Sequence, residues 1–170
     1  MCSFLLLMAL LIVGISIFWP GLRGAPWVPT PMHVVHRMLT MAQVGPDDLV
    51  YDLGCGDGRL IFAAAQQYGA RAVGVEIDPL RYVWCQVRIV SMGLQDRVRV
   101  VYGDLFQQDL GGADVVTCYL LQTTNEKLEK KLALELDLDA RVVSNSFTFP
   151  GLHLVGRDDQ AQVYLYNLRR

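Results

Sequence analysis

The chain has 170 residues, of which 52% are apolar, and its 15 basic and 17 acidic residues give a formal net charge of −2. This length is enough for one domain with its own core and excludes a multidomain protein. The near-neutral charge provides no general electrostatic attraction for nucleic acid.

The apolar residues are concentrated at the amino terminus, where Phe4 to Trp19 contains 14 apolar side chains in 16 residues. Together with their uncharged neighbours they make 21 residues, Cys2 to Leu22, which is enough to cross a hydrocarbon core of about 30 Å. The basic residues that precede the apolar stretch of a signal peptide are missing, and Arg23 follows the segment. Residues 1–22 are therefore predicted to be a single-pass membrane anchor with the remainder on the cytoplasmic side. A buried core helix or a cleaved leader is the alternative.

From Leu49 onward, short apolar runs alternate with helical stretches, a pattern typical of a parallel sheet covered on both faces. Strands are predicted over Leu49–Leu53, Ala72–Ile77, Val98–Tyr102, Asp114–Leu120, Arg141–Phe147 and, antiparallel at the sheet edge, Gln162–Leu168. Helices are predicted over Pro31–Val44, over Arg59–Tyr68, from Pro79 towards Gly93, and over Asn125–Leu136. Residues 23–47 then form a linker and a helix over the site, and residues 48–170 form the main domain.

A glycine-rich turn follows the first predicted strand. The chain reads Asp52-Leu53-Gly54-Cys55-Gly56-Asp57-Gly58, and a helix then begins at Arg59. Arg59 stands where the dinucleotide fingerprint GxGxxG needs its third glycine, and the Gly-Lys-Ser/Thr of a P-loop is missing. The turn therefore predicts close approach of a ligand to the backbone, without a pyrophosphate site.

Two further acidic residues end the next two predicted strands. Glu76 lies 18 residues after Gly58, where a carboxylate can accept hydrogen bonds from both hydroxyls of a ribose. Asp104 follows the third strand, where it can contact an adenine amino group beside the apolar Ile77 and Leu105. A purely turn-forming role is the alternative for Asp104. Together these residues predict a pocket for an adenosine that carries something other than phosphates.

At these residues the chain resembles the class I S-adenosylmethionine-dependent methyltransferases, whose first motif is an acidic residue followed by GxGxG. It is also similar to the archaeal broad-specificity protein lysine methyltransferases and to the mitochondrial lysine methyltransferases that act on the ATP synthase c-ring protein, at Pro26–Pro31, Val50–Arg59, Ala140–Ser144 and Val163–Tyr166. The resemblance implies an α/β fold with a Rossmann-like, seven-stranded, mostly parallel sheet. The cofactor-binding positions that it implies are Thr30, Asp52, Gly54, Cys55, Gly56, Asp57, Gly58, Glu76, Ile77, Asp104 and Leu105.

The narrower resemblance implies transfer of methyl groups to lysine amines, with residues 28–31 folded over the cofactor. This reaction requires a neutral amine held in line with the methyl group in a water-poor channel. Tyr119 is the first candidate for a catalytic residue in that channel, and Asn145 is the second. A role for Tyr119 in packing alone is the alternative. The residues around these two positions depart from the family pattern, so the resemblance leaves the choice of substrate open.

Three functions remain open at this point. The first is a protein lysine methyltransferase at the membrane, and the second methylates a small lipophilic molecule such as a quinone or a lipid precursor. The third is a scaffold that binds S-adenosylmethionine without turnover. The chain lacks the Asn/Asp-Pro-Pro-aromatic signature of enzymes that methylate nucleic-acid bases, so no nucleic-acid partner is expected. The widely spaced cysteines and the isolated pair His33 and His36 predict reduced thiols and no metal site.

Overall fold

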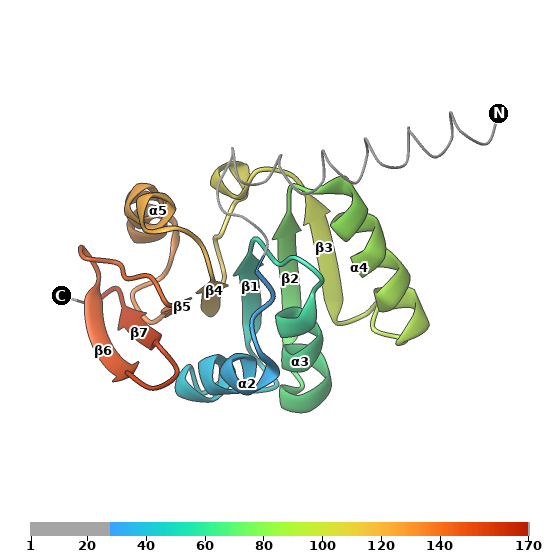
Figure 1. Ribbon diagram of the computed structural model, residues 1–170, viewed down its shortest axis with the longest axis horizontal. Coiled ribbons are helices and arrows are strands. Elements are labelled where there is room, and N and C mark those ends of the chain that lie inside the picture. The colour runs from blue at the N-terminus through green and yellow to red at the C-terminus, as the bar shows by residue number, and fades with distance from the viewer. Residues whose placement is uncertain (1–27, 170) are drawn as a thin grey trace.

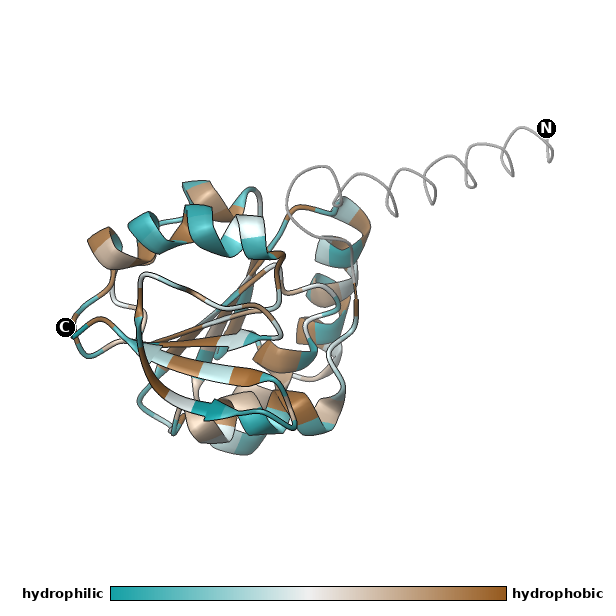
Figure 2. Cartoon of the chain, turned by 60° about the vertical axis from the view of Figure 1, so that its left-hand side comes forward, coloured by the Kyte–Doolittle hydropathy of each residue, from teal (hydrophilic) through white to brown (hydrophobic). Residues whose placement is uncertain are grey.

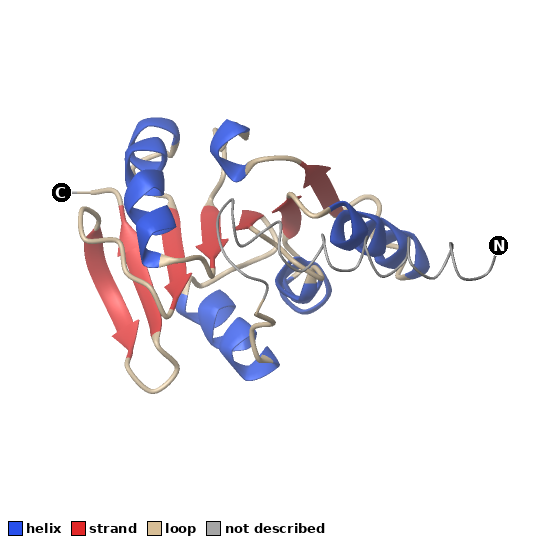
Figure 3. Cartoon of the chain, turned by 45° about the horizontal axis from the view of Figure 1, so that its top comes forward, coloured by secondary structure: helices blue, strands red, loops and turns tan. Residues whose placement is uncertain are grey.

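A computed structural model describes residues 28–169, in which helices cover both faces of a seven-stranded sheet (Figures 1 and 3). The predicted membrane anchor at residues 1–22 lies outside the described residues. Within residues 28–169, no helix combines the length and the apolar character needed to cross a membrane.

The sheet has the order β3-β2-β1-β4-β5-β7-β6. Its strands are β1 Leu49–Leu53, β2 Arg71–Glu76, β3 Val98–Tyr102, β4 Val115–Cys118, β5 Arg141–Asn145, β6 His153–Asp158 and β7 Val163–Asn167. Strands β1 to β5 are parallel, and β7 runs antiparallel between β5 and β6. The mostly parallel Rossmann-like sheet is therefore confirmed, and the carboxyl ends of β1, β2 and β4 lie together in its middle.

The helices enclose two separate apolar cores, one on each face of the sheet. Their bounds are α2 Met32–Met41, α3 Arg59–Tyr68, α4 Pro79–Ser91 and α5 Gln122–Glu135, with a 3-10 turn η1 at Leu105–Gln107. Side chains of α2, α3 and α4 fill the first core, and those of α5 fill the second. Hydrophobic residues recur along the strands between these layers (Figure 2).

Local signals explain where the helices next to the site begin and end. The α3 helix ends at Gly69, whose φ of 73° is the left-handed cap expected there. At the start of α4, the Asp78 carboxylate accepts hydrogen bonds from the amides of Leu80 and Arg81, and Pro79 occupies the first turn. These caps place the amino ends of α3 and α4 beside the carboxyl ends of β1 and β2.

The carboxyl-terminal third departs from the predictions in two ways. Gln162–Leu168 was predicted at the sheet edge, and this is wrong because β6 lies outside β7 and forms that edge. The sequence hid β6 because four of its six residues are largely exposed or charged and its pairing shifts between Leu154 and Gly156. Strand β4 is shorter than predicted and ends at Cys118, so Tyr119 lies in the loop before α5.

Candidate functional site

The glycine-rich turn between β1 and α3 forms the floor of the site. Gly54, Gly56 and Gly58 have φ values of 80°, 58° and 81°, a region that side chains rarely adopt. The amides of Gly54 and Cys55 both donate to the Val75 carbonyl oxygen, at 2.9 and 3.0 Å, which joins the turn to β2. The alternate glycines of the motif are therefore required by the backbone path of the turn.

Glu76, the last residue of β2, is buried at the edge of this turn, with a relative exposure of 5%. Its Oε2 accepts a hydrogen bond from the Gly56 amide at 2.7 Å, and its Oε1 accepts one from the Asp78 amide at 2.8 Å. Burial raises the pKa of this carboxyl, and the two backbone hydrogen bonds oppose that rise. Because each carboxylate oxygen can accept more than one hydrogen bond, the fixed group still has acceptors for two hydroxyls.

Asp52 lies at the end of β1 and is also buried in the site. Its Oδ1 accepts a hydrogen bond from the Thr117 hydroxyl at 2.9 Å. Burial raises the pKa of Asp52 to about 7, with further contributions from the charges of Glu76 and Asp57, while the hydrogen bond from Thr117 lowers it. The floor of the site therefore holds a carboxyl group that changes its charge near neutral pH.

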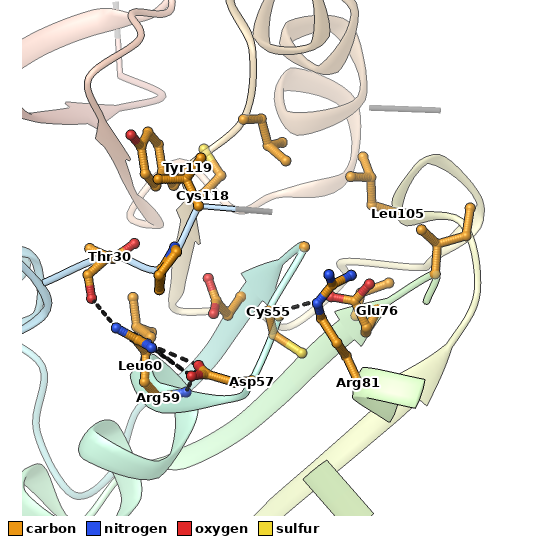
Figure 4. Close-up of a pocket in the computed structure, with 18 of the residues that line it drawn as sticks. Thr30, Cys55, Asp57, Arg59, Leu60, Glu76, Arg81, Leu105, Cys118 and Tyr119 are labelled. Carbon is orange, nitrogen blue, oxygen red and sulfur yellow. Dashed lines mark hydrogen bonds and ion pairs between the residues drawn. The ribbon is translucent and has the colours of Figure 1, made fainter. Parts of the chain in front are cut away.

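A cavity opens above these groups and is lined from several elements (Figure 4). The predicted residues that line it are Thr30, Asp52, Gly54, Cys55, Gly56, Asp57, Glu76, Ile77, Asp104, Leu105 and Tyr119. Two predicted residues, Gly58 and Asn145, are not among its lining residues. Gly58 forms the amino-terminal cap of α3, and Asn145 is buried at the end of β5, where its Oδ1 accepts a hydrogen bond from the Ser146 hydroxyl.

Residues 28–30 cover one side of the cavity, and Arg59 holds them there. The Arg59 Nη1 donates to the Thr30 carbonyl oxygen at 2.7 Å, and its Nη2 lies 2.6 Å from Oδ2 of Asp57. Burial favours a higher pKa for Asp57, but its hydrogen bonds with Arg59 prevail and the pKa is lowered. Figure 4 shows Asp57, Arg59 and Thr30 joined in this order. The sequence marked Arg59 only as a missing glycine, so this contact was missed.

Other lining residues were missed because they come from parts of the fold that no motif marks. They are Val28, Pro29, Met38, Leu60, Val75, Arg81, Gly103, Cys118 and Leu120. Leu120 could have been inferred from its neighbour Tyr119, and Arg81 from its place one turn after Asp78. Met38 on α2 offers no such signal, because it reaches the cavity only through the packing of α2 against α3.

The Asp104 carboxylate does what the turn-forming alternative predicts, and it also lines the cavity. Its Oδ1 accepts a hydrogen bond from the Phe106 amide at 2.9 Å and so caps η1. This bond fixes the carboxylate beside Leu105, on the side of the cavity where Ile77 also lies. The two interpretations of Asp104 are therefore compatible.

Replacing Asp52 with Asn is expected to stabilise the ligand-free protein at neutral and alkaline pH. The folded-state pKa of about 7 lies above the ordinary value of 3.8, so the wild-type carboxyl stabilises the fold when protonated. This contribution is fully present below about pH 4 and is lost as the pH rises to 7, by at most on the order of 4 kcal/mol. The melting temperature of Asp52→Asn should therefore exceed that of wild type by a margin that grows from pH 4.5 to 7 and is then constant. A margin independent of pH would contradict the raised pKa.

Comparisons with known proteins agree on the class of this site. The model of the ANTKMT methyltransferase domain family matches residues 52–155. A protein-lysine N-methyltransferase of Saccharolobus islandicus (strain REY15A) is 47% identical over 127 residues, which are 74% of this chain and 79% of the relative. A Xenopus laevis lysine N-methyltransferase of the ATP synthase c-ring protein is 33% identical over 146 residues, 85% of this chain and 64% of the relative, so the match spans slightly less than two thirds of that protein.

A solved structure supports the same assignment of the fold. An RNA methyltransferase from Salinibacter ruber, crystallised with S-adenosyl-L-homocysteine, superposes with a TM-score of 0.78 at 41% sequence identity. The superposition covers 82% of this chain and 91% of the other. Ligand-bound relatives of this fold therefore include a complex with the demethylated form of the predicted cofactor.

Proposed function

The chain belongs to the ANTKMT methyltransferase domain family, and from this premise we propose that it is an S-adenosylmethionine-dependent protein lysine N-methyltransferase that acts at a membrane. The observation that carries the activity is the Glu76 carboxylate, fixed by two backbone amides beside a glycine turn, in a chain 47% identical to a protein-lysine N-methyltransferase. The membrane location is supported by the composition of residues 1–22.

The lining of the cavity fits this cofactor better than it fits a nucleotide with phosphates. Glu76 provides hydrogen-bond acceptors for the ribose hydroxyls, and Ile77 and Leu105 provide apolar contacts for an adenine ring. The two cationic residues of the lining are both paired with carboxylates, Arg59 with Asp57 at 2.6 Å and Arg81 with Asp78 at 3.3 Å. The site therefore recognises a nucleoside through acceptors and apolar surface.

S-adenosylmethionine supplies a methyl group on a positively charged sulfur. The amine of the acceptor lysine forms a bond to this methyl carbon as the carbon–sulfur bond breaks, and the amine then loses a proton. The chain has to hold the amine neutral and in line, and an apolar entrance favours loss of the lysine proton. Cys118, Leu120 and the aromatic ring of Tyr119 line the cavity after β4 and provide such surroundings.

Methylation of lysine can be tested with the full-length chain, tritiated S-adenosylmethionine and membranes. We expect label in one or a few proteins, released as methyl-lysine after acid hydrolysis and assigned to a residue by mass spectrometry. Label that extracts into chloroform would favour a lipophilic small-molecule acceptor, and label in RNA would favour the activity of the Salinibacter relative. Cofactor binding with no labelled product in any fraction would favour a scaffold. Each of these three results would contradict the proposal, and the Glu76→Ala chain is the blank.

Tyr119 is proposed as the residue that positions the amine, with Asn145 as a weaker second candidate. Tyr119→Ala is expected to lower kcat by roughly 10-fold to 100-fold, because an unaligned amine loses part of the advantage of proximity. Tyr119→Phe separates the ring from the hydroxyl and should lie between Tyr119→Ala and wild type. The affinity for S-adenosyl-L-homocysteine, measured by calorimetry, should stay within about twofold in both variants, since an orienting role leaves cofactor binding intact. Full turnover in both would show that Tyr119 only packs.

The membrane part of the proposal has its own test. The chain is proposed to be a single-pass membrane protein with its catalytic domain on the cytoplasmic side. On this basis the full-length chain should sediment with membranes and resist carbonate extraction. Recovery of the full-length chain in the soluble fraction without detergent would contradict the anchor and leave the methyltransferase activity standing.

A further inference from the structure

The α4 helix presents a row of large apolar side chains to solvent. Their exposed fractions lie between 44% and 64%, and their spacing of three and four residues places them on one helix face. They are Leu80, Val83, Trp84, Val87 and Val90. The opposite face of α4 already holds the contacts with the sheet, through the buried Cys85 and Ile89. The exposed row, called here the α4 face, is therefore not needed for the core of the described domain.

A solvated outer helix face normally carries charged residues, and the α4 face carries none. The charged residues of α4 are Arg81 and Arg88. Arg81 pairs with Asp78, and the Arg88 guanidinium lies 4.4 Å from the centre of the Phe62 ring and donates to the Asp57 carbonyl oxygen. Both arginines thus interact around the amino-terminal end of α4 and the glycine turn. A continuous apolar surface of this kind marks an interaction site.

The α4 face is next to the mouth of the cofactor cavity. The helix starts directly after Ile77 and Asp78, and Arg81 from its first turn also lines the cavity. Figure 1 shows α4 at the outer margin of the molecule, beside the edge strand β3. Val28, which is 52% exposed, lines the same cavity. A surface that covers the α4 face therefore also lies close to the entrance through which an acceptor reaches the site.

The sequence before Val28 indicates what that surface is. Phe4 to Trp19 is apolar on every side of any helix that it forms, so the α4 face would cover only one of its sides, whereas a bilayer covers both the segment and the helix. Eight residues, Pro20 to Trp27, connect Trp19 to Val28 and reach at most about 28 Å when extended. A membrane that holds the segment is therefore within reach of the domain.

We propose that the α4 face docks on the lipid–water interface of the membrane, with its apolar side chains below the headgroups and the cofactor cavity open along the membrane surface. Trp84 lies in the middle of the face, and tryptophan favours this interface. The α4 helix contains no acidic residue that anionic headgroups would repel. The inference rests on the membrane part of the proposed function and extends it from an anchor to an orientation.

Trp84 provides a direct probe, because Trp19 and Trp27 are the only other tryptophans in the chain. The full-length W19F/W27F chain is reconstituted into vesicles of phosphatidylcholine and phosphatidylglycerol, with or without bromine atoms on the acyl chains. We expect a blue shift of Trp84 emission and at least about twofold quenching by the brominated lipid, as for an interfacial helix. Adding V83E/V87E should abolish both signals. The matched control, L134E/L138E, places the same charges at leucines that are 84% and 66% exposed elsewhere, and should leave both signals unchanged.

The possible results separate the inference from the function on which it rests. Vesicle-bound protein whose Trp84 is not quenched would overturn the docking surface and leave the anchor standing. Protein that does not bind vesicles at all would overturn the membrane part of the proposed function and the docking surface together. Shielding of Trp84 from aqueous iodide before any lipid is added would also overturn docking, and would show that residues 4–19 or a second copy cover the α4 face. Cofactor affinity should be equal in all variants.

Discussion

Replacing Glu76 with Ala is expected to weaken binding of S-adenosyl-L-homocysteine by roughly 100-fold or more. Its carboxylate is held at the end of β2 by the amides of Gly56 and Asp78, so its remaining lone pairs face the cavity in a fixed direction. Two hydrogen bonds from ribose hydroxyls to a charged acceptor contribute about 3 kcal/mol together, which corresponds to roughly a 100-fold change in Kd. Isothermal titration calorimetry on the purified chain measures this change directly.

The matched control for Glu76 is Asp158→Ala. The Asp158 Oδ1 also accepts hydrogen bonds from two backbone amides, those of Gln160 and Ala161, but in the hairpin between β6 and β7. Asp158→Ala should therefore lower the melting temperature through the same kind of loss and leave the Kd for S-adenosyl-L-homocysteine unchanged. If Glu76→Ala folds and binds with wild-type affinity, the ribose is not held by Glu76 and the assignment of this motif is wrong.

The residues of the site that could be predicted from the sequence are those whose role is set by neighbours along the chain. Glu76 and Asp104 each follow a strand with a clear apolar pattern, so their place at the carboxyl edge of the sheet follows from the order of the strands. The three glycines of the turn were predictable for the same reason, since a strand, a tight turn and a helix follow one another in sequence. The side chains that these positions bring together all come from one edge of a parallel sheet.

The rest of the site depends on contacts between elements that the sequence does not relate. The bond from Arg59 to the Thr30 carbonyl oxygen joins residues 29 positions apart, and the approach of Met38 depends on how α2 packs against α3. Asn145 was expected in the channel because it ends β5, but its buried side chain does not line the cavity. Gly58 was grouped with the ligand-binding glycines, although its conformation serves the start of α3.

Gly58→Ala is expected to destabilise the fold by about 3–5 kcal/mol, since it combines backbone strain with overpacking. Gly58 has a φ of 81°, and an added Cβ would lie 2.5 Å from Cε2 of Phe62 and 3.0 Å from Sγ of Cys85. The Phe62 ring cannot move aside easily, because it is only 2% exposed and lies against the Arg88 guanidinium. For a chain of this size the loss corresponds to a drop in melting temperature of roughly 10 °C or more.

Gly112→Ala separates the two causes, because Gly112 has almost the same φ, 79°, and an added Cβ there meets nothing within 4 Å. It should cost about 1 kcal/mol, the strain of a left-handed alanine alone. The difference between the two variants then measures the collision with Phe62 and Cys85. Gly58→Ala should also weaken cofactor binding, because a shift of the first turn of α3 moves Arg59 and Asp57, whereas Gly112→Ala should not. Equal losses of stability in both variants would mean that the Phe62 ring yields, and that Gly58 is required only for its backbone conformation.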